Sequence, residues 1–154
     1  MQDDDGVVVY SDTDWAGCVR TRKSTSGGCI IVGSHLIKTW SSTQSSVALS
    51  SGEAEFYGVV KASGYGLAYQ ALLHDFGLEK PLTVFTDSTA AMGIAARQGL
   101  GKIRHLDTNT LWVQQAVRCR RLALRKVLGE ENPADVVTKH IVGAEKLGSL
   151  MRLF

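Results

Sequence analysis

Several patterns that would mark a secreted or zinc-binding protein are missing from this sequence of 154 residues. Its three cysteines, Cys18, Cys29 and Cys119, form no CxxC pair and no cluster with histidine of the zinc-binding type. An odd number of widely spaced cysteines also argues against a disulfide framework. We therefore expect reduced, mostly buried thiols in an intracellular protein.

The start of the sequence does not have the pattern of a signal peptide, and the sequence has no long apolar run. The first five residues are acidic, whereas a signal peptide is basic and then apolar. No apolar stretch approaches the roughly 20 residues that cross a membrane, and we expect no membrane partner. Because an apolar segment follows the acidic start almost at once, we expect a domain cut out of a longer protein.

Neither sign of charge dominates the chain. Seventeen Lys and Arg residues face fifteen Asp and Glu residues, which gives a net charge of +2 and a pI near 8.5. This mild basicity permits a nucleic-acid partner without demonstrating one. The hydrophobic fraction of 44% and the length suit a single globular domain with one sizeable core.

The alternation of apolar and polar segments predicts an α/β protein. Strands are expected over residues 7–12, 28–32, 36–41, 82–86 and 122–127, and helices over 52–75, 88–97, 105–120, from 133 onward and over 144–154. Residues 16–27 are expected to form a loop, and residues 33–35 the turn of a hairpin. The order βββαβααβα predicts a five-stranded mixed sheet with the first strand near its centre and helices on both faces.

Four acidic residues occupy special places in this scheme. Asp12 and Asp87 end the first and fourth strands, Glu55 lies in the first turns of the long helix, and Asp135 opens a later helix. Ligands of open sheets gather at such strand ends. Any one of these residues alone is more often a helix cap or a dipole partner. The prediction of a site therefore rests on the set of four.

Seven short sequence segments, which follow one another in a fixed order, connect these four residues with a known protein family. They are YSDTDWAG (10–17), RKSTSG (22–27), WSS (40–42), VALSSGEAE (47–55), TDSTAA (86–91), KIRHLD (102–107) and NPADVVTK (132–139). Each is weak alone, but together they resemble the ribonuclease H domain of Copia-type (Pseudoviridae-like) retrotransposon polyproteins over nearly the whole chain. The resemblance implies a ribonuclease H-like fold, with residues 1–154 as a single domain C-terminal to a reverse transcriptase domain. It also implies hydrolysis of the RNA strand of RNA–DNA hybrids.

The family's metal-binding and catalytic carboxylates fall on Asp12, Glu55, Asp87 and Asp135. Asp12 is preferred to Asp14 because it follows the YS end of the strand, as the family's aspartate does. Glu55 is preferred to Glu53, because it shares a helix face with the small residues at 62 and 66, while Glu53 suits the helix cap.

The expected cofactor is a pair of Mg²⁺ ions, for which Mn²⁺ should substitute. Mg²⁺ prefers oxygen ligands, and two ions about 3.5–4 Å apart can activate water and stabilise a leaving oxygen. Without metal, repulsion would leave at least one carboxylate protonated. As a hypothesis, Asp12 bridges both ions, Glu55 and Asp87 hold the leaving-group side, and Asp135 holds the water side.

Hydroxyl-bearing and basic residues near these positions are candidate contacts for the substrate, since ribose is recognised through its 2′-hydroxyls. The candidates are Arg22, Ser24, Thr25, Ser26, Trp40, Ser42 and Ser88. Any single one is more often an ordinary loop or cap residue, and a strand tryptophan such as Trp40 is more often part of the core. The basic run over residues 118–126 is either a solvated face or a track for phosphates.

Histidine contributes little to the expected site. The loop over residues 128–134 contains none, although some ribonucleases H carry one there. His105 is expected to be structural. His140, five residues after Asp135, could approach the site, but a role in catalysis is not the favoured expectation. A basic protrusion also has no counterpart, so a neighbouring reverse transcriptase domain is expected to assist binding of the hybrid by an otherwise monomeric domain. The expected location is a cytoplasmic retrotransposon particle or the nucleus.

Three rival readings stay open on the sequence alone. One is a nuclease or integrase on the same fold that acts on DNA. The second is a non-catalytic or domesticated nucleic-acid-binding or interaction domain, against which the four retained acidic positions argue. The third is a sheet protein whose acidic residues are merely helix caps, which predicts no Mg²⁺-dependent change in stability.

Overall fold

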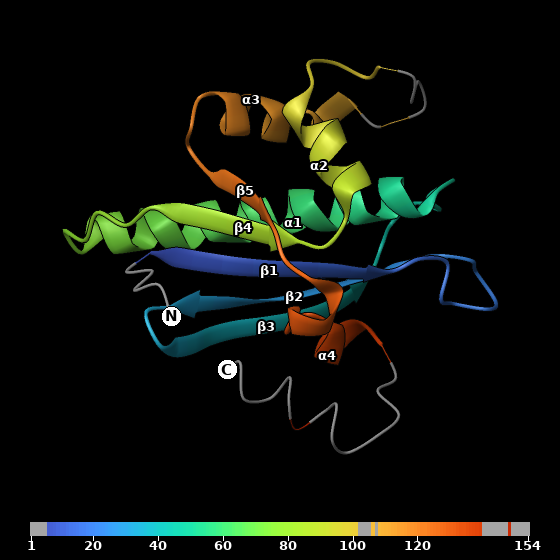
Figure 1. Cartoon of the computed structure of the whole chain (residues 1–154), viewed down its shortest axis with the longest axis horizontal. Helices are drawn as coiled ribbons and strands as arrows, with labels where there is room; N and C mark the ends of the chain where they lie inside the picture. Colours follow the sequence, from blue (N-terminus) through green and yellow to red (C-terminus); the bar gives the residue numbers. More distant parts are fainter. Residues whose placement is uncertain (1–5, 102–105, 107, 140–147, 149–154) are drawn as a thin grey trace.

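The computed structural model describes residues 6–101, 106, 108–139 and 148. Its elements follow the predicted order (Figure 1): β1 (Val7–Asp14), β2 (Thr25–Val32), β3 (His35–Thr43), α1 (Ser51–Asp75), β4 (Leu82–Thr86), α2 (Thr89–Ala96), η1 (Thr108–Thr110), α3 (Trp112–Arg118), β5 (Ala123–Lys126), η2 (Gly129–Glu131) and α4 (Asp135–Thr138).

The five strands form one mixed sheet in the order β3-β2-β1-β4-β5. β1 pairs antiparallel with β2 and parallel with β4, so it is the central strand, as the sequence predicts. β2 and β3 form an antiparallel hairpin, and β5 lies parallel to β4 at the other edge. Because β1 and β4 run in the same direction, the residues at their C-terminal ends meet at one edge of the sheet.

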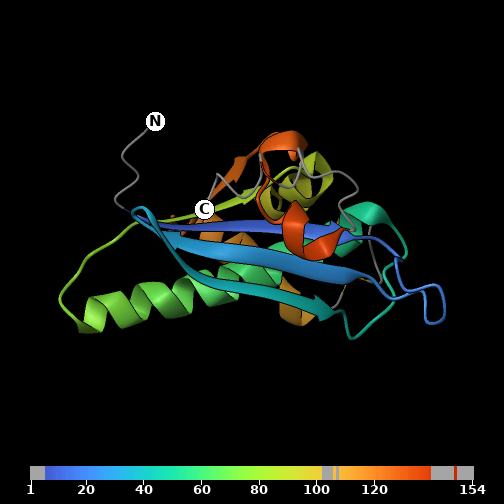
Figure 2. The ribbon, with the colours of Figure 1, turned by 90° about the horizontal axis from the view of Figure 1, so that it is seen from below.

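Helices α1 and α4 lie on opposite faces of this sheet (Figure 2). A Cβ atom on Gly58 of α1 would touch the hydroxyl groups of Thr13 and Ser26, whereas one on Gly27 would touch Val137 and Thr138 of α4. Neighbouring residues of a strand point to opposite faces, so Ser26 faces α1 and Gly27 faces α4. The predicted placement of helices on both faces is confirmed.

Close packing of α1 on the sheet explains two of its four glycines, Gly58 and Gly66. Val59 and Ala62 are fully buried, and a Cβ on Gly66 would lie 2.6 Å from Leu82 Cδ1. The predicted small-residue face therefore packs against the sheet. Gly64 has no such packing role, because no atom lies within 4 Å of the place its Cβ would occupy.

Strand β2 begins three residues earlier than the sequence predicts, at Thr25 instead of residue 28. Its serines and glycines are typical of a loop, but the ladder with β1 continues to the pair Asp14–Thr25. A side chain at Gly27 would collide with Thr138. The glycine is therefore a packing requirement within the strand, and the predicted loop is correspondingly shorter.

The helix predicted over residues 105–120 is also shorter in the described part of the chain. A 3-10 turn over Thr108–Thr110 precedes α3, which begins at Trp112. His105, His140 and nearly all of the predicted helix over 144–154 lie outside the described residues.

The expectation of mostly buried thiols is wrong. Only Cys29 is buried; Cys18 lies half-buried in the loop after β1, and Cys119 is exposed at the end of α3. All three cysteines are free of disulfides. Among the described helices, none is both long and apolar enough to span a membrane.

Candidate active site

Three of the four predicted carboxylates converge at the edge of the sheet where β1 and β4 end. Asp12 comes from β1, Glu55 from the N-terminal part of α1, and Asp87 directly follows β4. One oxygen of each lies within 4.8 Å of the oxygens of the other two. Gly129 in the segment between β5 and α4 also packs beside Asp87, with a virtual Cβ 3.1 Å from its Oδ2.

The fourth carboxylate, Asp135, joins this group through a lysine. Lys139 Nζ lies 2.7 Å from Asp135 Oδ1 and 3.3 Å from Asp12 Oδ1. Thr138 donates a hydrogen bond to the other oxygen of Asp12. The two aspartates are 4% and 1% exposed, so a single ammonium group serves two buried negative charges. Although burial works to lower it, the pKa of Lys139 is raised by its hydrogen bond to Asp135 and by both aspartates.

A buried asparagine fixes the start of α4 against the central strand. Asn132 Nδ2 donates to the Ser11 carbonyl at 3.0 Å, and its Oδ1 accepts from the Ala134 amide. Asn132 is fully buried, so both bonds are shielded from water. Ser11 directly precedes Asp12 in β1, so this bond brings Asp135, three residues after Asn132, toward the other carboxylates.

The N-terminus of α1 is capped as the sequence predicts. Ser50 accepts from the Glu53 amide, and the Glu53 carboxylate accepts from the Leu49 amide at 2.9 Å. Glu53 therefore serves the cap, while Glu55 lies among the clustered carboxylates.

Burial and mutual repulsion favour protonation within the cluster. Burial, followed by the charges of Asp12 and Asp87, raises the pKa of Glu55 to about 8. Burial and the charge of Asp12 also raise the pKa of Asp87. Glu55 Oε2 is buried and has no hydrogen-bond partner within the described part of the chain.

These features suit a hard divalent cation. An orphaned buried oxygen, together with carboxylates whose charges repel one another, is stabilised by a positive ion within reach of all three. The donor set is oxygen only, which matches Mg²⁺ or Mn²⁺ better than a soft metal. Among the described residues, Asp12, Glu55 and Asp87 are therefore the group whose oxygens lie close enough together to hold a metal ion.

The raised pKa of Glu55 predicts that the metal-free protein loses stability as pH rises. Its usual pKa is 4.5, and in the folded protein it is about 8. Because the folded state binds this proton more tightly, the stabilisation is complete below about pH 4.5 and is lost as pH rises through about 8. Glu55→Gln should flatten this part of the profile, measured as melting temperature against pH in EDTA. The control Asp75→Asn, at the exposed end of the same helix, should keep the slope; an equal slope in Glu55→Gln would contradict the assignment.

The other predicted substrate contacts fall into different environments. Ser24 is buried and accepts from the Ala16 amide, and Ser88 caps α2 by accepting from the Ala91 amide. Trp40 is 9% exposed and packs edge-on against Tyr65 in the core. Arg22 is exposed in the loop after β1 with a φ of 56°.

Ser26, Ser42 and Thr25 lie together on neighbouring strands. Ser26 of β2 pairs with Ser42 of β3, and Thr25 pairs with Thr43 next to them. Ser26 and Ser42 line a pocket on the α1 face of the sheet. Contact of any of these seven residues with a substrate stays a prediction.

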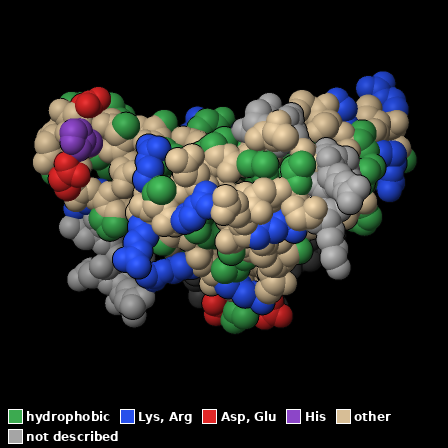
Figure 3. All heavy atoms as spheres, turned by 90° about the horizontal axis from the view of Figure 1, so that it is seen from above, with side chains coloured by type: hydrophobic (Ala, Val, Ile, Leu, Met, Phe, Trp, Pro, Cys, Tyr) green, Lys and Arg blue, Asp and Glu red, His purple; other side chains and the backbone are tan. Residues whose placement is uncertain are grey.

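The basic run forms an exposed surface of α3, β5 and the turn between them. Its exposed members are Arg118, Arg120, Arg121, Arg125 and Lys126. In Figure 3, Lys and Arg side chains are spread over this side of the molecule, whereas acidic side chains gather at its left end and lower margin. The distribution agrees with either predicted role of this run.

Sequence reasoning missed the parts played by Asn132, Thr138 and Lys139, although all three lie in the NPADVVTK segment. A signal for Lys139 was present: a residue four positions after Asp135 in a helix lies on the same face, where opposite charges pair. No comparable local signal pointed to Asn132, because its partner, Ser11, is 121 residues away.

Comparison with known proteins gives two consistent results, although no protein-family model matches the chain. The chain is 30% identical over 132 residues to the retrovirus-related Pol polyprotein from transposon TNT 1-94 of Nicotiana tabacum, an alignment that covers 84% of this chain and 10% of the relative. It is 29% identical over 134 residues to that of transposon RE1 of Arabidopsis thaliana, covering 85% and 9%. The chain thus spans about a tenth of the length of these curated relatives.

Comparison with solved structures identifies the fold of this chain. LC11-RNase H1, isolated from compost, matches with a TM-score of 0.58 at 16% identity, covering 86% of this chain and 92% of that one. The same protein in complex with an RNA/DNA hybrid matches with a TM-score of 0.53 at 16% identity, covering 85% and 92%. The protease–reverse transcriptase of prototype foamy virus matches with a TM-score of 0.58 at 15% identity, covering 95% of this chain and 19% of that one. The chain is therefore homologous to a segment of the retrovirus-related Pol polyproteins of plant transposons, and it has the ribonuclease H fold.

Proposed function

We propose that this chain is an endoribonuclease that hydrolyses the RNA strand of RNA–DNA hybrids with the help of divalent metal ions. The observation that carries the proposal is the convergence of Asp12, Glu55 and Asp87, whose oxygens lie within 4.8 Å of one another. The ribonuclease H fold supports it, as does the solved complex of LC11-RNase H1 with an RNA/DNA hybrid.

The proposed cofactor is two Mg²⁺ ions, with Mn²⁺ as a substitute. Asp12 is in contact with both parts of the site, since it lies beside Glu55 and Asp87 and shares Lys139 with Asp135. We therefore assign Asp12 to both ions, Glu55 and Asp87 to the leaving-group side, and Asp135 to the water side. When bound, such ions supply an activated water and stabilise the charge of the leaving oxygen.

The chain's own residues hold this arrangement rigid. Asn132 ties the start of α4 to β1, and the capped N-terminus of α1 fixes the helix that carries Glu55. Positioning of this kind is what brings a scissile phosphate into line with its nucleophile. The rigid frame comes from three elements that are far apart in the sequence.

The similarity to Pol polyproteins of plant transposons supports the biological setting that we propose. As part of a Copia-type Pol polyprotein, the domain would follow a reverse transcriptase domain, which would help to hold the hybrid. We propose that the isolated domain is a monomer that acts in a cytoplasmic retrotransposon particle or in the nucleus. The domain boundaries of residues 1–154 belong to the same proposal.

A cleavage assay tests the function directly. End-labelled RNA–DNA hybrid, duplex DNA and duplex RNA of one sequence are incubated with the protein in Mg²⁺, Mn²⁺ or EDTA. Products from the RNA strand of the hybrid alone, in either metal but not in EDTA, are expected. Cleavage of duplex DNA would favour a DNA nuclease on the same fold. Binding of the hybrid without any cleavage would favour the non-catalytic or domesticated alternative.

A further inference from the structure

The C-terminal end of α1 presents an apolar surface that the described part of the chain leaves uncovered. Leu72 is 48% exposed, Phe76 at the helix end is 74% exposed, and Leu78 just beyond it is 47% exposed. These three residues are called the apolar end of α1. Figures 1 and 2 show this end of the helix reaching past the sheet at the left of the molecule. Grouped apolar side chains of this size are typical of an interaction surface, whereas single ones are not.

A ridge of residues spaced four apart continues this surface toward the middle of the helix. It consists of Gly64, Ala68, Leu72 and Phe76. Gly64 and Ala68 are exposed, and no described atom lies within 4 Å of the place where a Cβ of Gly64 would be. Small side chains in such a ridge let a second helix cross α1 at a short distance. Glycine weakens a helix interior, and a crossing helix accounts for its presence at position 64.

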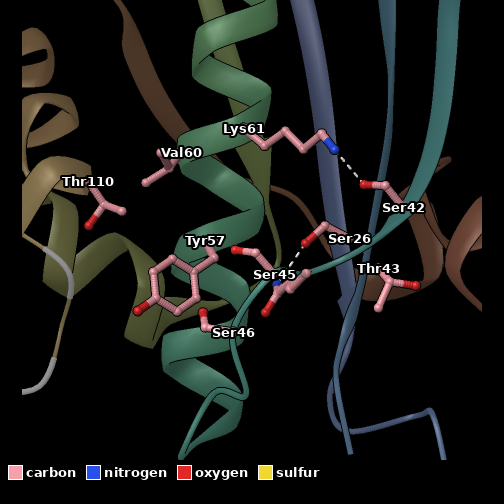
Figure 4. Close-up of a pocket in the computed structure, with 10 residues that line it drawn as sticks. Ser26, Ser42, Thr43, Ser45, Ser46, Tyr57, Val60, Lys61 and Thr110 are labelled. Carbon is pink, nitrogen blue, oxygen red and sulfur yellow. Dashed lines mark hydrogen bonds between the residues drawn. The ribbon is translucent and has the colours of Figure 1, made fainter. Parts of the chain in front are cut away.

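The N-terminal half of α1 has different neighbours. Tyr57, Val60 and Lys61 line a polar pocket against the β2–β3 hairpin, and Figure 4 shows Lys61 turned toward Ser42 of β3. The carboxylate of Glu55 lies further toward the helix start, about 30 Å along the axis from the last residue of the helix. The apolar end of α1 is therefore separate from both the pocket and the carboxylates.

Backbone hydrogen bonds fix the shape of the helix end. Gly77, with a φ of 78°, donates to the His74 carbonyl at 2.8 Å. The amide of Leu78 donates to the Leu73 carbonyl at 2.9 Å. Together these are the two bonds of a Schellman motif, which requires a left-handed residue such as this glycine. Phe76 and Leu78 are consequently held in place before a partner arrives, which lowers the entropic cost of binding.

The start of the described chain lies near this helix end. The Val7 amide donates to the Pro81 carbonyl at 2.8 Å. Pro81 follows Phe76 by five residues, which span at most about 18 Å. Gln70 of α1 donates to the Lys80 carbonyl at 2.7 Å, so the linking segment is held against the helix. A polyprotein region that precedes this domain therefore enters it within reach of the apolar end of α1.

Acidic side chains border the apolar end of α1. Asp75 and Glu79 are exposed, and Glu79 forms an ion pair with His74 at 3.0 Å. Figure 3 shows acidic side chains, a histidine and hydrophobic side chains together at the left end of the molecule. Two copies of this surface would bring like charges together, whereas a partner with basic edges is attracted. The charge therefore favours a different region of the polyprotein over a second copy of this chain.

We propose that the apolar end of α1 docks a helix of the polyprotein region that precedes this domain. The apolar face of that helix packs on Leu72 and Phe76, and its basic edges lie beside Asp75 and Glu79. The inference rests on the proposed position of this chain within a Pol polyprotein, since the chain spans about a tenth of the relative from Nicotiana tabacum. Docking at this end leaves the edge of the sheet that carries the carboxylates open to a substrate.

Hydrogen exchange provides the first test, by comparing this chain alone with the chain extended by the region encoded before it. The amides of residues 72–79 should exchange more slowly in the extended chain, because the docked helix shields them. The amides of residues 17–23, in the loop after β1, should exchange at the same rate in both. Equal exchange of residues 72–79 in the two chains would overturn the proposal.

Substitutions provide the second test, with the preceding region supplied as a separate chain. Leu72→Gln combined with Phe76→Gln should weaken its binding by about thirtyfold or more, as expected for central apolar contacts. The matched control, Val19→Gln combined with Leu49→Gln, removes two exposed apolar side chains elsewhere and should bind like the parent. Asp75→Lys should slow association, most strongly at low salt. Since all five side chains are exposed, the melting temperatures should stay close to that of the parent.

The remaining outcomes separate the possible occupants and the two proposals. Equal binding by the two double variants, or faster association of Asp75→Lys, would overturn the proposed partner. Dimers of the parent chain alone in analytical ultracentrifugation, lost on Leu72→Gln with Phe76→Gln, would assign the surface to a second copy and also overturn it. Weaker docking by that double variant in a protein that never cuts the hybrid would support the surface and reject only the nuclease.

Discussion

Asp12→Asn should abolish hydrolysis of the hybrid while leaving the fold and hybrid binding largely intact. Asp12 is 1% exposed and lies between the other three carboxylates. After burial, its charge is the largest cause of the raised pKa of both Glu55 and Asp87. A side chain with this position contributes to the binding of both proposed ions, and metal ions contribute several kcal/mol to such reactions. A loss of about 4 kcal/mol corresponds to roughly a thousandfold fall in kcat.

The expected survival of the fold has a structural reason. Asparagine has nearly the same shape as aspartate, and its remaining oxygen can still accept from Thr138 or Lys139. The substitution also removes one of the charges that repel Glu55 and Asp87. We therefore expect the circular dichroism spectrum to be unchanged and the melting temperature to move by only a few degrees.

Asp14 offers a matched control for this variant. It lies two residues further along the same strand, and its carboxylate packs over Gly17 in the following loop. Asp14→Asn removes the same charge close by but outside the carboxylate cluster, so it should keep the parent's kcat. Loss of activity in Asp14→Asn with retention in Asp12→Asn would reverse the assignment that the sequence favoured.

The sheet was largely predictable because its strands have strong local signals. The apolar run before Asp12 and the strand between Pro81 and Asp87 stand out from their polar surroundings, and β4 begins and ends where predicted. Strand β2 was harder, since its first residues are Thr, Ser and Gly. The glycine at position 27 is explained by α4, which packs on it from more than a hundred residues away, and no local pattern near Gly27 announces that contact.

The sequence was sufficient to predict which carboxylates belong to the candidate site, but not their surroundings. Ordered motifs selected Asp12, Glu55, Asp87 and Asp135, and the structure brings the first three into one cluster. The burial and hydrogen bonding of these carboxylates could not be predicted from motifs, because both depend on contacts between segments that are distant in the sequence. The orphaned oxygen of Glu55 and the bond from Asn132 to Ser11 follow from how α1 and α4 pack on β1.

Lys139 should stabilise the metal-free site and compete with the ion that Asp135 is proposed to hold. Its ammonium group contacts Asp12 at 3.3 Å and Asp135 at 2.7 Å, so it occupies a position between the two carboxylates. An ion bound by Asp12 and Asp135 needs the same oxygens. The lysine side chain is 43% exposed, so it can swing toward solvent when an ion arrives.

Lys139→Met removes the ammonium group and keeps most of the apolar stem. In EDTA the variant leaves two buried aspartates without their shared partner. Breaking a buried ion pair costs about 3–5 kcal/mol, and the partial exposure of Lys139 reduces this to about 1–2 kcal/mol. The melting temperature in EDTA should therefore fall by about 5 °C.

Added Mg²⁺ should reverse that loss. Because no lysine competes for Asp12 and Asp135, Mg²⁺ should raise the melting temperature of Lys139→Met by more than that of the parent, and half-saturation should need less Mg²⁺. Lys139→Arg, which keeps the charge, should behave like the parent in EDTA, and Lys126→Met on β5 controls for loss of an exposed cation. If Lys139→Met and the parent melted together in EDTA and responded equally to Mg²⁺, the lysine would be a surface contact with no part in the metal site.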